Sequence, residues 1–146
     1  MEVFRRPANL FVAGFIGTPP MNFFEASLVM NEGNVILDCG DFKLDLDEKY
    51  YEILRRTVHG GELVLGVRPH NLEIYRERPG KASFEAEVFA VEPLGTETVV
   101  DVKVGDNIYK IVTGPDFTAR IADKVYVVIN TDNIHLFDKK SGFALA

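Results

Sequence analysis

The sequence is poor in the residues that most often carry chemistry. It has one cysteine, three histidines and no tryptophan among 146 residues. Cys39 has no second cysteine with which to form a disulfide or a metal knuckle, so we expect a reduced thiol on a strand, without a chemical role. The histidines, His59, His70 and His135, lack the short spacing of metal ligands. We therefore expect neither a disulfide scaffold nor a metal centre.

The common nucleotide-binding and hydrolytic motifs are also missing. The one Gly-Lys pair, Gly80-Lys81, is followed by Ala82 and has no glycine at the offset of a phosphate-binding loop. No GxGxxG, HExxH, EF-hand loop or GxSxG occurs either. We therefore expect that this chain is not an enzyme and holds no cofactor.

Long apolar runs and an excess of positive charge are absent as well. No segment approaches the roughly eighteen apolar residues of a membrane helix, and residues 1–9 lack the layout of a signal peptide. The formal net charge of −6 disfavours nucleic acid as a partner, because such binding relies on Lys and Arg to neutralise phosphates. We expect a cytoplasmic protein that binds no nucleic acid.

The first twenty residues have the pattern of a short helix followed by a stiff strap. Pro7 suits a helix start and Gly17 a helix end, which predicts a helix over residues 7–16. Most of its surface is apolar, so this helix must pack on another element. Pro19 and Pro20 then force extended backbone.

The rest of the chain is divided by turn residues into short strands. The expected strands are residues 24–30, 34–38, 62–68, 84–91, 97–104, 107–113 and 124–130. This spacing is typical of a β-barrel or a β-sandwich. One inserted helix is expected between Asp47, as its N-cap, and His59, before Gly60 ends it.

The chain also resembles itself. ELVLGVRPHNLEIY (62–75) matches KVYVVINTDNIHLF (124–137) at its apolar positions, and Phe24-Glu25-Ala26 matches Phe84-Glu85-Ala86. The pattern predicts two half-repeats, about 21–80 and 81–146, that bury their apolar strand faces against each other in one pseudo-symmetric barrel. A chance match of alternating patterns is the other interpretation.

Two turns carry polar residues that are candidates for contacts. Glu92 and Glu97 flank the turn 93–96, which we interpret as a hairpin with a polar tip in preference to an acid/base pair. Arg68 ends an apolar strand directly before Pro69. Its guanidinium either binds a carboxylate, across the barrel or on a partner domain, or only clamps the turn.

Four stretches, in this order, resemble one family. RRPANLFVAGFIGTPPMNF, GVRPHNLEI, AVEPLGTETVV and NIHLFDKKSG are similar to signatures of the ATP-binding subunits of carbohydrate ABC importers of the maltose and glycerol-phosphate type. The resemblance covers nearly the whole chain. In that family a regulatory, OB-like barrel of the TOBE class follows the ATPase domain.

The resemblance implies a domain organisation. Residues 1–20 would be the connector helix and Pro-rich strap from an ATPase domain that the chain lacks, and residues 21–146 the OB-like regulatory barrel. The chain then corresponds to an excised or separately encoded C-terminal half, and the ATPase activity would belong to the full-length subunit. Two departures stand out: His70 replaces a glutamate common in the family, and the helix within 47–59 is an insertion.

The leading functional hypothesis is a regulatory and dimerisation module. By family resemblance, two copies hold each other while their ATPase domains open and close, with the membrane subunits and a possible regulatory protein as further partners at the inner face of the membrane. The excess of apolar side chains near the strap supports a contact surface for a second copy, and the other interpretation is that part of it is the face that the missing ATPase domain would cover. The candidate interface residues are Phe15, Pro19, Pro20, Met21, Asn22, Phe23, Arg68, Glu92, Gly95, Thr96 and Glu97.

The alternative hypothesis is a barrel that senses a small ligand, an oxyanion or a sugar. OB-like barrels bind oligomeric ligands on one face. The acidic charge, the lack of tryptophan and the absence of a Ser/Lys-rich anion loop weigh against this alternative.

Overall fold

The computed structural model describes residues 20–57 and 61–145. The helix predicted for residues 7–16, with Phe15, and Pro19 of the strap lie outside these ranges. The chain divides into two compact units. Unit 1 comprises the chain up to Val67 together with the segment from Asn133 onward, and unit 2 is Arg68–Asp132.

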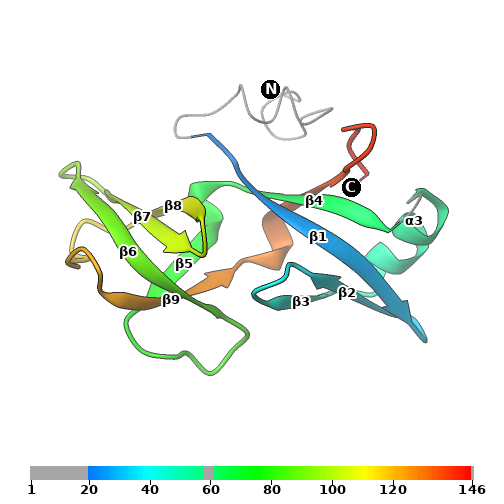
Figure 1. Cartoon of the computed structure of the whole chain (residues 1–146), viewed down its shortest axis with the longest axis horizontal. Coiled ribbons are helices and arrows are strands. Elements are labelled where there is room, and N and C mark those ends of the chain that lie inside the picture. The colour runs from blue at the N-terminus through cyan, green and yellow to red at the C-terminus, as the bar shows by residue number, and fades with distance from the viewer. Residues whose placement is uncertain (1–19, 58–60, 146) are drawn as a thin grey trace. The chain divides into compact units, whose positions relative to one another are not determined.

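Unit 1 is built on an antiparallel five-stranded sheet with the order β10-β4-β1-β2-β3. The alternation of the strand residues places Phe24, Leu37, Leu65 and Leu136 on the buried face, where each is at most 2% exposed. Figure 1 shows the long strand β1 crossing this unit. The strands are β1 (Asn22–Asn31), β2 (Asn34–Asp38), β3 (Lys43–Leu46), β4 (Glu62–Val67) and β10 (Ile134–Asp138).

Helix α3 (Lys49–Thr57) lies between β3 and β4 and packs beside β2. It begins where the sequence predicts, since the backbone N–H of Lys49 donates to Asp47 Oδ1 at 3.2 Å. Tyr50 and Leu54, one turn apart, are buried at 9% and 0% exposure, as their helical spacing predicts. Val58, the next residue at this helical spacing, lies outside the described residues.

Unit 2 is built on a second antiparallel sheet, with the order β5-β9-β6-β7-β8. Its two edge strands, β5 and β8, also contact each other, so the sheet curls in the manner of an OB-like barrel. The strands are β5 (Leu72–Tyr75), β6 (Phe84–Pro93), β7 (Thr98–Val104), β8 (Asn107–Thr113) and β9 (Lys124–Ile129).

The two sheets repeat the same topology in the same register. Phe24 lies opposite Leu65 in unit 1, and Phe84 lies opposite Val127 in unit 2. The short 3₁₀ helices η1 (Pro69–Asn71) and η2 (Thr131–Asn133) occupy equivalent places in the two matched segments. The prediction of a mainly β, OB-like fold made of two half-repeats is thus confirmed.

The single barrel that we expected is a less accurate description. Each sequence repeat contributes four strands to one sheet and its last strand, β5 or β10, to the other. The chain therefore forms two compact units instead of one, and these units are not the sequence halves. The division at residue 20 and the repeat limits 21–80 and 81–146 stay predictions.

All seven strands predicted from the sequence are present, with shifts of one or two residues at their ends. The strands β3, β5 and β10 were not among them. β3 and β5 have only four residues each, too few for alternation to distinguish a strand from a turn, and β10 does not alternate, since four of its five residues are buried.

Candidate interaction surfaces

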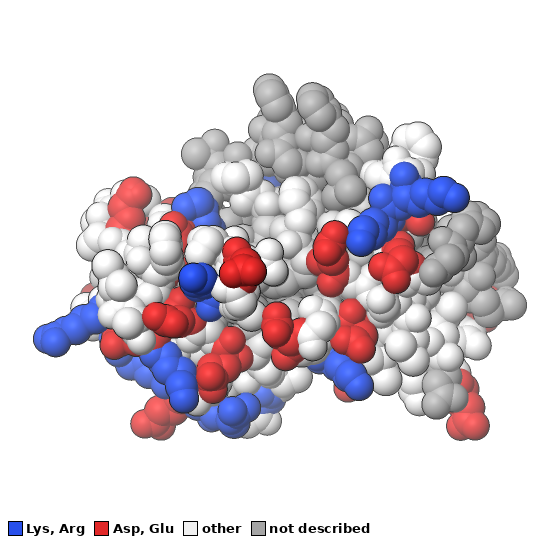
Figure 2. Space-filling view, viewed as in Figure 1, with Lys and Arg blue, Asp and Glu red and all other residues white. Residues whose placement is uncertain are grey.

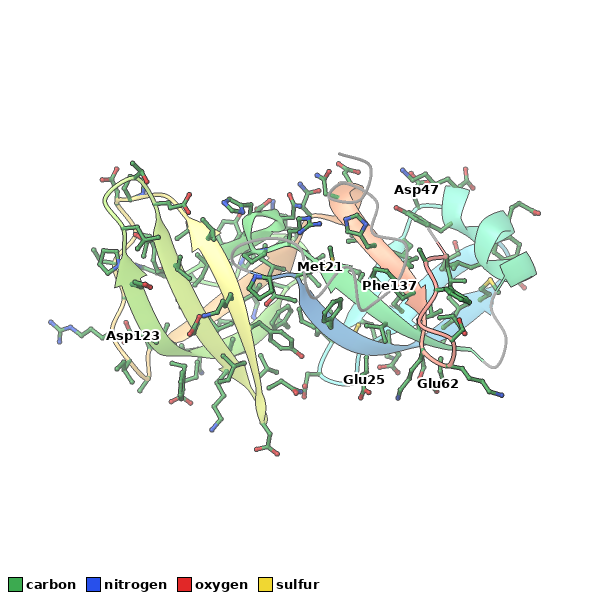
Figure 3. The ribbon with its side chains drawn as sticks, turned by 90° about the horizontal axis from the view of Figure 1, so that it is seen from above. Met21, Glu25, Asp47, Glu62, Asp123 and Phe137 are labelled. Atoms are coloured by element: carbon green, nitrogen blue, oxygen red, sulfur yellow. The ribbon has the colours of Figure 1, made fainter. Side chains whose placement is uncertain are left out.

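The end of the strap leads into a small apolar cluster of unit 1, the Met21 cluster. Met21, Val64 and Phe137 pack together at 4%, 7% and 0% exposure, and half-buried Phe23 packs against them. The rings of Phe23 and Phe137 meet edge to face, with centroids 6.3 Å apart. Figure 3 shows Met21 and Phe137 in this part of the unit. The cluster holds the chain around the start of β1 against the sheet.

A glycine makes this packing possible. A Cβ on Gly66 would lie 2.5 Å from Met21 Sδ and 3.0 Å from Phe137 Cε2, which is closer than van der Waals contact allows. The neighbouring Asn22 is buried at 7% exposure, and its side-chain amide donates to the carbonyl oxygen of Val67 at 3.2 Å. Side chain and backbone thus both anchor the first residues of β1 to β4.

These positions bear on the predicted interface residues of the strap. Met21 and Asn22 are buried within unit 1, Phe23 is half-buried, and Pro20 is exposed. Among the strap residues that the structure describes, Pro20 and part of Phe23 are accessible from outside. An interface role for any of the four stays a prediction.

In unit 2 the structure brings two of the predicted groups together, and we name the result the turn surface. It consists of Arg68–His70, at the start of η1, and of Glu92–Glu97, the hairpin between β6 and β7. His70 Nε2 lies 3.7 Å from Glu97 Oε1. The sequence could not predict this meeting, because its residues are nearly thirty positions apart and belong to different repeats.

The hairpin has the polar tip that the sequence predicts, with one apolar addition. The N–H of Leu94 donates to the carbonyl of Glu97 at 2.8 Å, and Gly95 adopts a φ of +89°, which favours glycine. Glu92, Gly95 and Thr96 are exposed, and the Leu94 side chain is 52% exposed. Leu94 is the residue of this surface that sequence reasoning missed.

Arg68 is held at the base of the turn surface. Its carbonyl oxygen accepts from the N–H of Asn71 at 2.9 Å, and the carbonyl of Asn71 accepts from the N–H of Asn130 at 3.0 Å. The backbone of Arg68 therefore takes part in the turn, while the role of its guanidinium stays a prediction. Partial burial lowers the pKa of the Arg68 guanidinium below its ordinary value.

Other types of site find little support. Within residues 20–57 and 61–145, no group of three or more His, Cys, Asp or Glu side chains is arranged to hold a metal ion. Burial, with a smaller contribution from Asp38, raises the pKa of the Cys39 thiol to about 12, which makes it a poor nucleophile. None of the helices described is both long and apolar enough to cross a membrane.

Two family models match the chain in succession. Residues 17–72 match the MalK OB fold domain, and residues 65–137 match the TOBE domain. The overlap falls on β4 and η1, where the chain passes from unit 1 to unit 2.

Several curated proteins match along almost the whole chain. The trehalose/maltose import ATP-binding protein MalK of Thermococcus litoralis is 38% identical over 99% of this chain and 39% of its own length. The xylose/arabinose import ATP-binding protein XacK of Haloferax volcanii is 36% identical, over 99% of this chain and 37% of its own. The chain thus spans less than two-fifths of the length of these relatives.

One solved structure shares the fold. A cytoplasmic molybdate-binding protein, ModG, determined with molybdate bound, aligns with a TM-score of 0.62 and 16% identity over 79% of this chain and 94% of its own. Because the TOBE model covers half of the chain and the relatives match nearly all of it, the chain belongs to the family of MalK-type OB and TOBE domains found in the ATP-binding subunits of sugar ABC importers.

Proposed function

We propose that the chain is the regulatory and dimerisation region of the ATP-binding subunit of a sugar importer. The observation that carries the proposal is the extent of the match: 99% of this chain aligns with import ATP-binding proteins and accounts for only 39% and 37% of their length. The chain has no phosphate-binding loop of its own, so ATP hydrolysis would belong to an ATPase domain that it accompanies.

In this role the chain would pair with a second copy in the cytoplasm, beneath the membrane subunits of the importer. Pairing of the regulatory regions would keep two ATPase domains together while they open and close. A regulatory protein is a further possible partner.

Among the candidate interface residues that the structure describes, those of the turn surface of unit 2 suit pairing best. Leu94 supplies an exposed apolar side chain at its centre, and Glu92, Thr96 and Glu97 supply a polar rim. An apolar centre within a polar rim is the usual anatomy of a protein interface. The η1 contacts and the Leu94–Glu97 hydrogen bond hold the surface in one conformation, which lowers the entropy cost of association.

Sedimentation velocity over a concentration series tests the proposal. We expect a dimer that dissociates on dilution, and we expect Leu94→Asp to raise its dissociation constant at least tenfold. Val29→Asp is the matched control, since Val29 is 45% exposed on β1 of unit 1. Met21→Asp is a poor choice, because it would place a carboxylate in the Met21 cluster and unfold unit 1.

The two negative results differ in meaning. A chain that stays monomeric at every concentration would contradict pairing by this region alone. A dimer that Leu94→Asp leaves unchanged would contradict only the turn surface, and it would direct attention to Pro20 and Phe23.

A second candidate function, binding of a small oxyanion or sugar, is favoured by one observation, the fold shared with a molybdate-binding protein. The test is a thermal shift with molybdate, sulfate and maltose. Saturation at a hundred times the dissociation constant would add about 2.7 kcal/mol to the free energy of unfolding. An unchanged melting temperature with all three would remove this candidate.

A further inference from the structure

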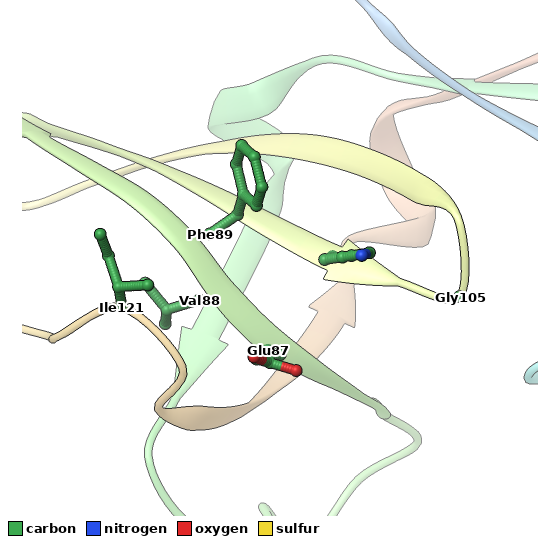
Figure 4. A pocket seen from close by; sticks show the side chains of 6 residues that line it. Glu87, Val88, Phe89, Gly105 and Ile121 are labelled. Atoms are coloured by element: carbon green, nitrogen blue, oxygen red, sulfur yellow. The ribbon is translucent and has the colours of Figure 1, made fainter.

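Unit 2 has a hollow that the turn surface does not include. It has a volume of about 430 Å³ and is lined by Glu87, Val88, Phe89, Lys103, Gly105 and Ile121. Figure 4 shows Phe89 and Ile121 standing out from the backbone on either side of strand β6. Both side chains are apolar and exposed, Phe89 by 53% and Ile121 by 72%.

Phe89 lies on the exposed face of β6, as Glu85 and Glu87 do, and the strand is irregular at this residue. The register between β6 and β7 shifts between Val88 and Ala90, so Phe89 is the extra residue of a β-bulge. Val88 beside it is 1% exposed and keeps its place in the core. Bulges of this kind are frequent next to functional sites.

A second irregularity directly follows Ile121 in the chain. Ala122 has a φ of +79°, a left-handed conformation that costs free energy in any residue with a Cβ. Two hydrogen bonds of 2.8 Å hold it there, from the N–H of Ala122 to the carbonyl of Val88 and from the N–H of Val88 to the carbonyl of Asp123. The bulge and the strained turn are thus bonded to each other, and together they present two apolar side chains to solvent.

Two charged side chains of opposite sign line the same hollow. Glu87 and Lys103 lie directly opposite each other on β6 and β7, yet neither makes an ion pair in the part of the chain that the structure describes. Elsewhere in this sheet Lys110 pairs with Asp101 at 2.9 Å and Lys124 with Glu85 at 3.7 Å. The hollow therefore offers one acceptor and one donor of opposite charge next to an apolar pair.

We propose that this hollow is a docking site for a segment of another protein. The segment would place one aromatic or aliphatic side chain between Phe89 and Ile121, with a basic residue toward Glu87 and an acidic residue toward Lys103. An apolar anchor with charge-complementary flanks is a common form of peptide recognition. Pairing with a second copy is proposed above for the turn surface, which shares no residue with this hollow, so the occupant proposed here is a different protein. The site is separate from the turn surface and does not depend on pairing.

Selection of random dodecapeptides displayed on phage, with the full chain as target, tests this proposal without a known partner. We expect enriched peptides to share an aromatic or aliphatic residue with a basic and an acidic neighbour. For a synthesised winner, Phe89→Ser and Ile121→Ser should each raise the dissociation constant at least tenfold. Leu94→Ser, a substitution of comparable exposure on the turn surface, should leave it unchanged.

The exchange of the two charges gives a second readout. The double variant Glu87→Lys, Lys103→Glu keeps the size and number of charges, so it should fold normally and prefer peptides in which the two flanking charges are swapped. The proposal fails if no peptide is enriched, if the winners bind the Phe89→Ser, Ile121→Ser variant equally well, or if the exchange leaves the preference unaltered. It also fails if that variant no longer self-associates in sedimentation, since a second copy would then cover the hollow.

Discussion

Gly66 shows how much a single residue can decide in this fold. It lies on β4 between the side chains of Met21 and Phe137, and the space above its Cα is already filled. Because Phe137 is fully buried, its ring cannot move away freely, whereas the end of the Met21 side chain can rotate. The absence of a side chain at this residue therefore allows Met21 and Phe137 to pack together on the sheet.

Gly66→Ala should lower the free energy of unfolding by about 1–3 kcal/mol through overpacking. Urea unfolding measures the loss, and Gly80→Ala is the control, since a Cβ at Gly80 meets nothing within 4 Å. Met21→Ala in the Gly66→Ala background should recover part of the loss, because it removes the nearest atom. Equal effects of Gly66→Ala and Gly80→Ala would contradict the packing described.

Cys39 gives a pH-dependent prediction. Burial, helped by Asp38, raises the pKa of its thiol from 9.0 to about 12, so the folded chain favours the neutral thiol. This contribution to stability is complete below pH 9 and is lost as the pH rises toward the folded value. Compared with Cys39→Ala, the natural chain should lose more stability between pH 8.5 and 10.5 in urea titrations. Parallel pH profiles would show that the thiol is not shielded.

At the scale of elements, local signals explain where the chain changes from strand to helix. Asp47 accepts a hydrogen bond from the N–H of Lys49, and Tyr50 and Leu54 face the sheet. These features depend on neighbours a few positions apart, so the sequence alone predicts them. The same holds for the alternating strands, in which every second residue is buried.

Asp47→Ala should lower stability by about 1 kcal/mol, because one N–H at the first turn of α3 loses its acceptor. Circular dichroism during thermal unfolding measures the effect. Asp45→Ala, two residues earlier on an exposed position of β3, is the control and should change little. If both variants unfold at the same temperature, Asp47 does not cap the helix.

At the scale of the whole molecule, the sequence could not predict that β5 and β10 each join the sheet formed by the other repeat, an arrangement that we call the strand exchange. Alternation fixes which face of a strand is buried but not which sheet the strand joins. The matched segments 62–75 and 124–137 were visible in the sequence, whereas their crossing between the two sheets was not. For the same reason the contact of His70 with Glu97 was beyond sequence reasoning.

The exchange predicts which unit a substitution loosens. Ile134 pairs with Val67 in unit 1, and Leu72 pairs with Ile129 in unit 2. Ile134→Ala and Leu72→Ala should each cost roughly 2–5 kcal/mol. In hydrogen exchange, Ile134→Ala should expose amides of β4 and β1 first, and Leu72→Ala those of β9 and β6. The opposite assignment would mean that each repeat closes on its own last strand.

The strand exchange also sets the order in which the chain can fold during its synthesis. Unit 2 is continuous from Arg68 to Asp132, so all of its strands have been translated before β10 is made. Unit 1 begins earlier but cannot complete its sheet until residues 134–138 leave the ribosome. The region translated first is thus the last to complete its sheet, and one edge of β4 stays unpaired while unit 2 folds.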